Sequence, residues 1–403
     1  MKSTLIISSQ KNILPTISDI NSLMNVTIAI DSFKGSLTSV EAGETAAEGI
    51  RLVYPDAQIK VCPLADGGEG TVEAITRGCG GRLVRVSVTG PLGRKVDAEY
   101  GVTPDGCAVI EMSSAAGITL IDTEERNPLY TTTYGVGELI LHAIRVMACR
   151  KFIIGIGGSA TNDGGVGMLS ALGFEFLTDK NEPIDRGAIG LSTLAKIVTE
   201  NAAKELWECE FHIACDVKNP LCGEQGCSAI FGPQKGATQE MIADMDKWLR
   251  KYAALAEEMT GVAAKEHPGA GAAGGMGFAF ISFLGGKLES GIELVIRETN
   301  LEKYIKESDI VITGEGRLDG QSCMGKAPIG VARVAEKYGK PTIAFAGAVT
   351  RDAKETNKHG ITASFPILRS VGTLNEAMDK TNSHNNLKEA VEQAFRLIKA
   401  LKD

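Results

Sequence analysis

Charged and hydroxyl side chains lie together in four glycine-rich segments, each of which follows an apolar run. The segments contain Asp31 and Lys34; Asp66, Gly67, Gly68 and Glu69; Ser159, Thr161, Asn162 and Asp163; and Glu315, Arg317, Asp319 and Lys326. In open α/β sheets, ligands bind beyond the carboxyl ends of strands, where small residues let the backbone approach them closely. One such segment alone is equally well explained as a tight turn that caps the next helix. Four together favour an active site.

These residue types suit phosphoryl transfer, which needs cations on the transferred group, a carboxylate-held Mg²⁺ and a group that orients the acceptor hydroxyl. The candidate anion-binding side chains are Lys34, Arg94, Lys235, Arg317 and Lys326. The candidate Mg²⁺ ligands or bases are Asp66, Asp163, Asp216, Glu315 and Asp319. An aspartate is a weak base, but it can orient a hydroxyl and take its proton late. None of the five histidines lies in a glycine-rich segment with a nucleophile, which disfavours covalent catalysis.

The segment GQSCMGKAP, residues 320–328, matches the phosphate-binding pattern G-x-x-x-x-G-K-[ST] except at Ala327. Ala327 cannot bind Mg²⁺, and Gly-Glu-Gly-Arg-Leu-Asp separates the apolar run DIVIT from Gly320, whereas a P-loop follows its strand directly. Pro328 suits the first turn of a helix and leaves the preceding amides free for an anion. We expect Lys326 to bind phosphate outside a P-loop; a solvated lysine near a helix start is the alternative.

The segment GIGGSA, residues 155–160, matches the dinucleotide-binding pattern G-x-G-x-x-[GA]. Further glycines in TNDGGVG delay the helix that should follow, and no acidic residue ends a second strand about 20 residues later. The pattern leaves open a nicotinamide-dependent oxidoreductase of a small hydroxy acid, which would rest on Gly155, Gly157 and Ala160.

Composition argues against several other classes of protein. The formal net charge is −8 and no long basic run is present, so we expect no nucleic-acid partner. The nine cysteines are scattered, and the spacings of Cys215, Cys222 and Cys227 do not fit a zinc site. This usage predicts reduced thiols and a cytoplasmic protein. No segment approaches about 18 uninterrupted apolar residues, so we expect no membrane span.

Apolar runs predict the elements that position these residues. Buried strands are expected at VTIAI (26–30), KVCPLA (60–65), KFIIGIGG (151–158) and FHIACDV (211–217). A capping box at residues 38–41 begins a helix, and further helices are expected over 135–147 and 238–259. Short β-rich runs between residues 82 and 112 indicate hairpins. Near the C-terminus, DIVIT, PTIAFAG and ASFPIL alternate with helical stretches and indicate a parallel sheet, so both chain ends are expected to form one domain with the middle inserted.

Six ordered segments resemble those of the bacterial glycerate kinases of the first type. They are IAIDSFKGSLTSVEA (28–42), PLADGGEGT (63–71), GIGGSATNDGG (155–165), FGPQKGA (231–237), GAGAAGGMGFA (269–279) and ITGEGRLDGQSCMGKAP (312–328). The similarity begins near Val26 and continues almost to the C-terminus. The sequence departs from the family at Ala29-Ile30, where the family often has Ala-Pro, and in its first 25 residues, which the family usually lacks.

The resemblance implies ATP-dependent phosphorylation of D-glycerate, usually to 2-phosphoglycerate, with ATP and Mg²⁺ as cofactors. It also implies two α/β domains. The first is a discontinuous flavodoxin-like domain, which we place at residues 26–64 and 294–403. The second is an inserted mixed α/β domain likened to restriction enzymes, which we place at residues 65–293. Residues 1–25 are expected to be an N-terminal extension that is poorly ordered or precedes an effective start at Met24.

We expect the substrates of such a kinase to bind in a cleft between the domains. The expected catalytic residues are Asp66, Asp163 and Lys34. The expected substrate- and nucleotide-binding residues are Ser36, Gly67, Gly68, Glu69, Arg94, Gly157, Gly158, Ser159, Thr161, Asn162, Glu315, Arg317, Asp319 and Lys326. The expected metal ligands are Asp163 and Asp216. In this hypothesis Lys34, Arg317 and Lys326 hold the substrate carboxylate and the phosphates, and Asp66 and Asp163 orient the acceptor hydroxyl or Mg²⁺.

Besides the oxidoreductase, a non-catalytic regulator with two lobes is an alternative, since it would bind glycerate or nucleotide without releasing ADP. The likeness to restriction enzymes suggests a nuclease, but the net acidity and the lack of a basic face weigh against one. Small molecules are the expected partners, a homo-oligomer is compatible with the sequence, and neither nucleic acid nor membrane is expected.

Overall fold

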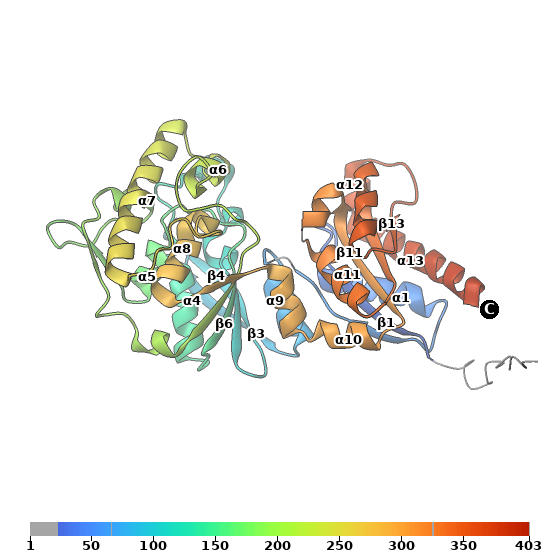
Figure 1. The fold of residues 1–403 in the computed structure, drawn as a ribbon. Coiled ribbons are helices and arrows are strands. Elements are labelled where there is room, and N and C mark those ends of the chain that lie inside the picture. The colour runs from blue at the N-terminus through green and yellow to red at the C-terminus, as the bar shows by residue number, and fades with distance from the viewer. Residues whose placement is uncertain (1–22, 66, 325, 403) are drawn as a thin grey trace, which may run out of the picture.

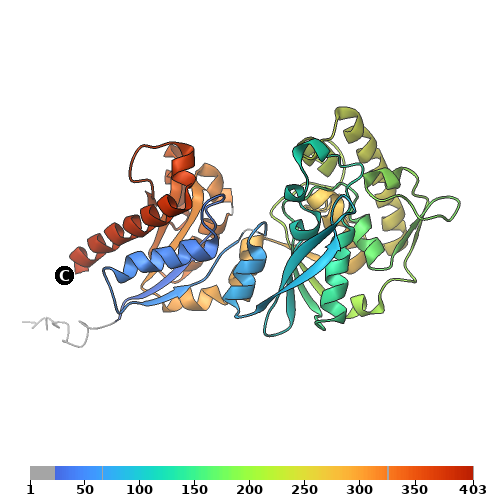
Figure 2. The ribbon, with the colours of Figure 1, turned by 180° about the vertical axis from the view of Figure 1, so that it is seen from behind.

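The structure, a computed structural model, describes residues 23–65, 67–324 and 326–402. Figure 1 shows two lobes side by side, and Figure 2 shows them from behind. The first lobe combines the blue N-terminal part of the chain with the orange and red C-terminal part, whereas the second contains the teal, green and yellow middle. Each lobe consists of a β-sheet with helices packed on it. The predicted architecture of two α/β domains is confirmed.

The first lobe contains five parallel strands in the order β13-β12-β11-β1-β2. They are β1 (Asn25–Ile30), β2 (Gln58–Val61), β11 (Ile310–Leu318), β12 (Thr342–Val349) and β13 (Ala363–Pro366). Counted along the chain within this sheet, the order is 2-1-3-4-5, as in flavodoxin-like folds. The direction of winding reverses between β1 and β11. This pair is therefore the topological switch point, beside which such sheets bind ligands.

Helices cover both faces of this sheet, which explains the continuous apolar runs of its strands. Ile28 and Ile30 of β1 belong to a core cluster with residues of α1 (Ser39–Arg51) and α13 (Lys380–Lys402). Ala29, between them in sequence, belongs to a cluster with residues of α11 (Ala327–Lys337) on the other face. Successive side chains of a strand point to opposite faces, so both faces demand an apolar residue here.

The predicted capping box begins α1. The Glu41 amide donates to the Thr38 hydroxyl at 3.2 Å, and the Thr38 amide donates to the Glu41 carboxylate at 3.0 Å. Thr38→Ala should lower the free energy of unfolding by about 1 kcal/mol, because a first-turn amide loses its acceptor. Urea denaturation measures this loss. Thr38→Ser keeps the hydroxyl and should lose about half as much or less; equal losses in both variants would show that the hydroxyl contributes nothing.

The second lobe contains a mixed sheet with the order β10-β9-β6-β5-β4-β3. Its strands are β3 (Arg82–Thr89), β4 (Lys95–Val102), β5 (Cys107–Glu111), β6 (Lys151–Gly155), β9 (Glu210–Ala214) and β10 (Lys287–Glu289). The first three pair antiparallel, which confirms the predicted hairpins, while β5, β6, β9 and β10 pair in parallel. The carboxyl ends of β6 and β9 consequently lie next to each other.

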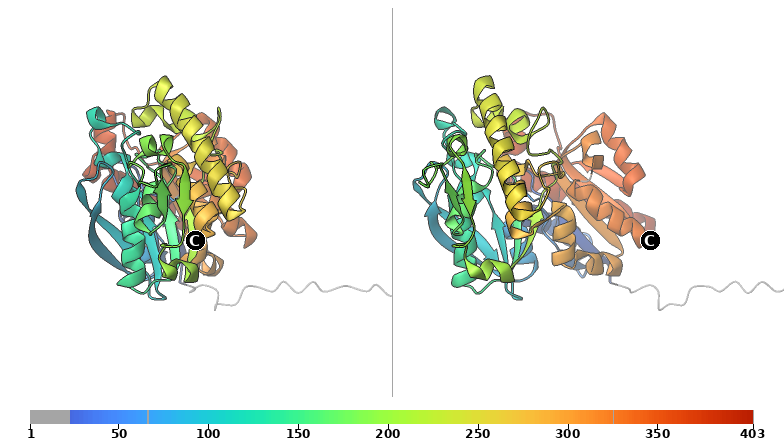
Figure 3. Two further views of the ribbon diagram at one scale, coloured as in Figure 1. Left: turned by 90° about the vertical axis from the view of Figure 1, so that its left-hand side faces the viewer. Right: turned by 60° about the vertical axis from the view of Figure 1, so that its left-hand side comes forward.

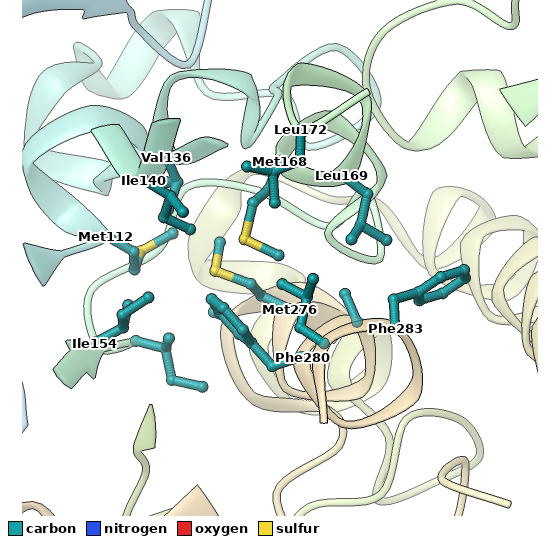
Figure 4. Close-up of a cluster of buried hydrophobic side chains, with 14 of the residues drawn as sticks. Met112, Val136, Ile140, Ile154, Met168, Leu169, Leu172, Met276, Phe280 and Phe283 are labelled. Atoms are coloured by element: carbon teal, nitrogen blue, oxygen red, sulfur yellow. The ribbon is translucent and has the colours of Figure 1, made fainter. Parts of the chain in front are cut away.

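Buried aliphatic, aromatic and methionine side chains form the core of the second lobe. They come from its sheet and from α4 (Tyr134–Arg145), α5 (Val166–Ala171), α7 (Gln239–Thr260) and α8 (Ala272–Leu284). Figure 4 shows Met168 of α5 beside Met276 of α8, with Phe280 close to them. Methionine is flexible and fills irregular gaps between elements. Figures 1 and 3 show α7 on the side of this lobe that faces away from the first lobe.

A third core cluster joins the two lobes. It contains Ala29 and Val311 from the first sheet, Val109, Ile153 and Ala214 from the second, and residues of helices between them.

The remaining α-helices and strands are α2 (Thr71–Gly78), α3 (Ser113–Ala116), α6 (Cys227–Phe231), α9 (Gly291–Glu298), α10 (Leu301–Glu307), α12 (Leu374–Met378) and the hairpin β7 (Glu175–Leu177) with β8 (Lys196–Val198). Of these, α2, α9 and α10 contribute to the joining cluster, so apolar burial fixes how the lobes meet.

Several predicted boundaries differ from the structure. Strand β2 ends at Val61, β6 at Gly155 and β9 at Ala214, so each is shorter at its carboxyl end than predicted, and the residues that follow form loops. Strand β1 begins at Asn25, inside the expected N-terminal extension, of which residues 1–22 lie outside the described residues. The expected domain boundary after residue 293 falls inside α9 and would divide a helix. The division into two domains at these residues stays a prediction.

All nine cysteines carry free thiols, as the sequence predicted. Within the described part of the chain, no helix combines the length and the apolar character that crossing a membrane requires.

Candidate active site

A pocket of about 490 Å³ lies at the switch point of the first sheet. Asp31 and Lys34 follow β1, Glu315 and Arg317 belong to β11, and Lys326 begins α11; all five line this pocket. Ser36 lines it as well. Residues of the first and the fourth glycine-rich segments therefore lie together at the carboxyl ends of β1 and β11, as expected if these segments share one site. Three cationic and two carboxylate side chains share this pocket.

A tight loop between β1 and α1 places Lys34. The Phe33 amide donates to the Leu37 carbonyl at 2.8 Å, which closes the loop around Lys34. Gly35 has a φ of 82° there, and a Cβ atom at Gly35 would lie 2.5 Å from Cε of Met378. Besides the switch-point pocket, Lys34 lines a pocket of about 390 Å³ beside α1 and α2 and a pocket of about 500 Å³ in the second lobe. Its side chain thus lies where the pockets of the two lobes adjoin.

GQSCMGKAP does not form a P-loop. Its first five residues are the 3₁₀ helix η7 (Gly320–Met324), and Lys326 is the N-cap of α11. The amides of Gln321 and Ser322 donate to the Asp319 carboxylate, and the Gly320 amide donates to Asp352. These amides are bonded to carboxylates and so cannot cradle phosphate as a P-loop does. One argument from the sequence was wrong, because β11 continues to Leu318 and no separate segment precedes the loop.

Asp319 and Glu315 organise the polar side of the switch-point pocket. The Asp319 carboxylate lies 3.3 Å from Nε of Arg317 and 3.9 Å from Nζ of Lys326. Glu315 is buried and accepts a hydrogen bond from the Ser322 hydroxyl at 2.5 Å. Asp319 does not line the pocket; it holds two of the cations that do.

The opposite wall of this pocket is apolar, and sequence reasoning missed it. It is formed by Phe33, Ile367, Leu368, Leu374 and Met378. Leu374 and Met378 belong to the short helix α12 and are exposed, and neighbouring exposed apolar side chains often mark a ligand-binding groove. These residues carry no motif and come from parts of the chain far apart in sequence. The local signal for part of this wall is the spacing of Leu374 and Met378, which are four residues apart and so share one face of a helix.

The second lobe contributes a polar pocket of about 500 Å³ at the carboxyl ends of β6 and β9. Its predicted residues are Lys34, Gly67, Gly68, Glu69, Gly157, Gly158, Ser159 and Asp216. The two glycine-rich segments touch through their backbones, since a Cβ at Gly155 would lie 2.5 Å from the Gly67 carbonyl oxygen. This contact explains the need for glycine there. Asp66 lies outside the described residues, although its neighbours line the pocket.

Lys235 is buried at the wall of this pocket, with 2% of its surface exposed. Its Nζ donates to the Ser159 hydroxyl at 2.8 Å and to the Thr161 carbonyl at 2.6 Å. Burial lowers the pKa of Lys235 to about 8. The sequence indicated Lys235 only as one of several candidate cations, since nothing in FGPQKGA showed that its side chain is enclosed.

Asp163 is a predicted catalytic residue and metal ligand that the structure places elsewhere. It is buried, and its carboxylate accepts four hydrogen bonds: from the Thr133 amide (2.8 Å), the Thr133 hydroxyl (2.9 Å), the Gly165 amide (3.1 Å) and the Gly167 amide (3.2 Å). Burial raises the pKa of Asp163, and these donors oppose that shift. Thr133 and Gly165 are the N-caps of α4 and α5. Asp163 lines a different pocket, beside α5 and the hairpin residues Glu175–Leu177, and links the starts of two helices.

The remaining predicted residues fall into two groups. Thr161 and Asn162 are fully buried, and the Asn162 amide group donates to the Ser228 hydroxyl at 2.8 Å, so both support the loop after β6. Arg94 forms an exposed ion pair with Glu125 at 3.0 Å and lines none of the pockets described above. Its position does not agree with the expected anion-binding role.

The dinucleotide pattern after β6 also lacks its structural context. Helix α5 begins only at Val166, well after Ala160, so no helix N-terminus follows the glycines directly. The delayed helix that the sequence predicted is confirmed. No group of three or more His, Cys, Asp or Glu side chains suited to a metal ion occurs in residues 23–65, 67–324 and 326–402.

Comparison with known proteins agrees with this architecture. The glycerate kinase family matches residues 26–399. The chain is 50% identical over 355 residues to a glycerate 2-kinase of Escherichia coli K12, which covers 88% of this chain and 93% of the relative. It is 46% identical over 376 residues to a glycerate kinase of Haemophilus influenzae. This match covers 93% of this chain and 99% of the relative. A crystal structure described as a candidate glycerate kinase 2 of Salmonella typhimurium LT2 has a TM-score of 0.86 at 44% identity, covering 94% of this chain and 100% of that one.

The fold, the cationic pocket and these relatives together define a phosphotransferase with two α/β domains. The chain belongs to the glycerate kinase family, since the match covers nearly its whole length. The family predicted from six short segments is thereby confirmed, and a kinase is favoured over the oxidoreductase and the non-catalytic regulator.

Proposed function

We propose that this protein transfers the γ-phosphoryl group of ATP to D-glycerate in the region where the pockets of the two lobes adjoin, and that the product is 2-phosphoglycerate. The observation that carries the proposal is the position of Lys34, which lines both the switch-point pocket and the polar pocket of the second lobe. Phosphoryl transfer needs cations on the transferred group, and a lysine that lines both pockets is placed to supply one of them. The name of the Escherichia coli relative, glycerate 2-kinase, supports the position of phosphorylation.

The switch-point pocket suits the nucleotide. Its apolar wall, which includes Phe33, Leu374 and Met378, offers a surface for an adenine ring. Arg317, Lys326 and Lys34 on the other side supply positive charge for a triphosphate. The polar pocket of the second lobe, with its glycine backbone and Ser159, suits the smaller hydroxy acid.

Mg²⁺ in kinases is commonly held by one or two carboxylates together with phosphate oxygens and water, so a cluster of three carboxylates is not required. Asp31 and Glu315 line the switch-point pocket, and the exposed Asp216 lines the polar pocket, so these residues fit such an ion. When bound, Mg²⁺ would neutralise charge on the phosphates. We propose a positioning role for Asp163 and retain Asp66, the other predicted catalytic aspartate, as the candidate that orients the acceptor hydroxyl.

The proposal also retains the interdomain position of the reaction, a cytoplasmic location and small-molecule partners. Nine free thiols support the expected location. Closure of the two lobes would exclude water, so that ATP hydrolysis does not compete with transfer.

A coupled ADP-release assay with D-glycerate, L-glycerate, D-lactate and glycolate tests the proposed function. D-Glycerate should give a kcat/KM at least about 10²-fold higher than the other acids, because each lacks or misplaces a hydroxyl that the site must bind. Phosphorus NMR of the product should show a phosphate ester of a secondary alcohol. ADP release that does not depend on glycerate would contradict the proposed function. A phosphate ester of the primary alcohol as the product would contradict the proposed position of phosphorylation.

A further inference from the structure

Lys235 is a buried cation whose recorded partners are both neutral. It ends the 3₁₀ helix η6 (Pro233–Lys235), between α6 and α7, and only 2% of its surface is exposed. Its Nζ donates to the Ser159 hydroxyl and to the Thr161 carbonyl, and no carboxylate of the described residues forms an ion pair with it. The buried Asp163 carboxylate acts on Lys235 through space but does not bond it, and burying a charge without an ion-pair partner is costly. A site built this way gains when an anionic ligand supplies the missing charge.

The groups around Lys235 face the same pocket. Because the Ser159 oxygen accepts from Lys235, the hydroxyl proton of Ser159 must point to a different acceptor. The amides of Gly157 and Gly158 have no recorded acceptor among the described residues, and Gly158 has a φ of 73°. Successive amides with one residue in the left-handed region form a concave anion site. An ammonium, a hydroxyl and two amides thus line one end of the polar pocket.

We propose that Lys235, the Ser159 hydroxyl and the amides of Gly157 and Gly158 bind the carboxylate of the acid substrate, and that Lys235 determines the requirement for an acid. This inference rests on the proposed function. A single enclosed ammonium balances one negative charge, as a carboxylate requires. The triphosphate carries more charge and is served by the exposed Lys34 and Arg317 and the half-buried Lys326 at the other pocket. The sequence assigned the substrate carboxylate and the phosphates to the same three cations. In this proposal Lys235 binds the carboxylate, and the other three cations bind the phosphates.

A structural role for Lys235 predicts a different response to substitution. If Lys235 only held the loop after β6 through Ser159 and Thr161, its loss would destabilise the second lobe and affect both substrates alike. If it binds the carboxylate, an apolar side chain of similar length removes the cost of burying a charge, while glycerate affinity falls. Stability and affinity therefore respond in opposite directions to the same change.

The test compares Lys235→Met with Lys287→Met, which removes an exposed lysine of the same lobe that pairs with Glu210. Isothermal titration without nucleotide should show at least about 30-fold weaker D-glycerate binding in Lys235→Met, as expected for loss of a buried charged contact. The KM for ATP should change less than about threefold, and the melting temperature should not fall. Lys287→Met should match the wild type. An unchanged glycerate affinity, or a larger effect on ATP than on glycerate, would overturn the inference.

Two further arms keep the result decisive. Ser159→Ala leaves Lys235 in place and should weaken D-glycerate binding by about fivefold to tenfold, the value of one hydrogen bond, so a folding failure of Lys235→Met does not end the test. Glycerol, which lacks the carboxylate, should bind wild type and Lys235→Met equally weakly. If the wild type binds D-glycerate through Lys235 but releases no ADP, the proposed function fails while the subsite stands.

The pH dependence of binding provides an independent readout. The pKa of Lys235 is lowered by burial to about 8 in the free protein, so deprotonation above that pH removes the charge that attracts the carboxylate. The dissociation constant of D-glycerate should therefore rise up to about tenfold per pH unit above 8. The groups near Lys235 are the Cys227 thiol on α6, whose pKa burial raises to about 11, and the Asp163 carboxylate; Asp216, Glu69 and Lys34 line the same pocket. A dissociation constant that stays constant from pH 7 to 9.5 would contradict the role of Lys235.

Discussion

Replacement of Lys34 with alanine is expected to lower kcat for glycerate phosphorylation by about 10³-fold, with smaller changes in KM for ATP and glycerate. Lys34 lines the pocket proposed for the nucleotide and the pocket proposed for glycerate, so under the proposed function its ammonium lies beside the path of the transferred group. Negative charge spreads over the equatorial oxygens of that group in the transition state. A cation that contacts these oxygens at that moment contributes to kcat, whereas one that contacts only bound ATP contributes to KM.

Steady-state kinetics with varied ATP and varied glycerate separate these possibilities. Lys34→Arg keeps the charge but not the shape of the side chain, so a partial loss of about tenfold to 10²-fold is expected. Lys358→Ala is the matched control, because Lys358 is an exposed lysine of the same lobe that pairs with Glu355. If Lys34→Ala raised the KM for ATP and left kcat unchanged, Lys34 would only bind the ground state, and the transfer path would have to lie elsewhere.

Much of the fold could be predicted because its local signals agree with one another. The runs VTIAI and DIVIT consist mainly of apolar residues because both faces of the sheet are covered, and the capping box at Thr38 defines the start of α1. The antiparallel strands β3 to β5 follow from short runs separated by glycine and proline. The end of β11 could not be predicted, since Gly-Glu-Gly-Arg has no strand pattern. It continues as a strand because β12 supplies hydrogen-bonding partners as far as Leu318.

The site could be predicted where the backbone alone brings residues together. Lys34, Glu315 and Arg317 follow or end neighbouring parallel strands, and the topology therefore places them at one edge. The apolar wall of that pocket depends on how α12 and the residues after β13 pack, which no local pattern encodes. The sequence likewise identified Lys235 as a basic residue but not its enclosure, which results from the packing of η6 against the loop after β6.

Asp163 shows the limit of arguing from residue type. An aspartate in a glycine-rich segment has the composition of a catalytic or metal-binding group, but the side chain turns into the second lobe. The glycines that follow it bring amides close enough to bond its carboxylate, as Gly165 and Gly167 do. Such an aspartate substitutes for a capping residue at two helix starts, because the first amides of a helix have no partner within it.

Replacement of Asp163 with alanine should therefore act mainly on stability, lowering the free energy of unfolding of the second lobe by about 3 to 5 kcal/mol. Four donors, two of them from Thr133, would lose their acceptor in a buried place. Asp163→Asn keeps one oxygen but presents an amide group to other donors, and about 2 kcal/mol is expected. Both tryptophans, Trp207 and Trp248, lie in this lobe, so their fluorescence during urea unfolding reports its stability.

The exposed Asp244 on α7 supplies the control, since Asp244→Ala should change the free energy of unfolding by less than about 0.5 kcal/mol. If Asp163 only positions the loop, the folded fraction of Asp163→Asn should have a kcat within about tenfold of the wild type. The assay is run well below the melting temperature of the variant. The opposite pattern, a wild-type urea midpoint with a kcat lowered about 10³-fold, would identify Asp163 as a group that acts on the substrates. In that case the carboxylate would have to exchange its bonds to Thr133 and Gly167 for the reacting atoms, which requires the loop after β6 to rearrange when the substrates bind.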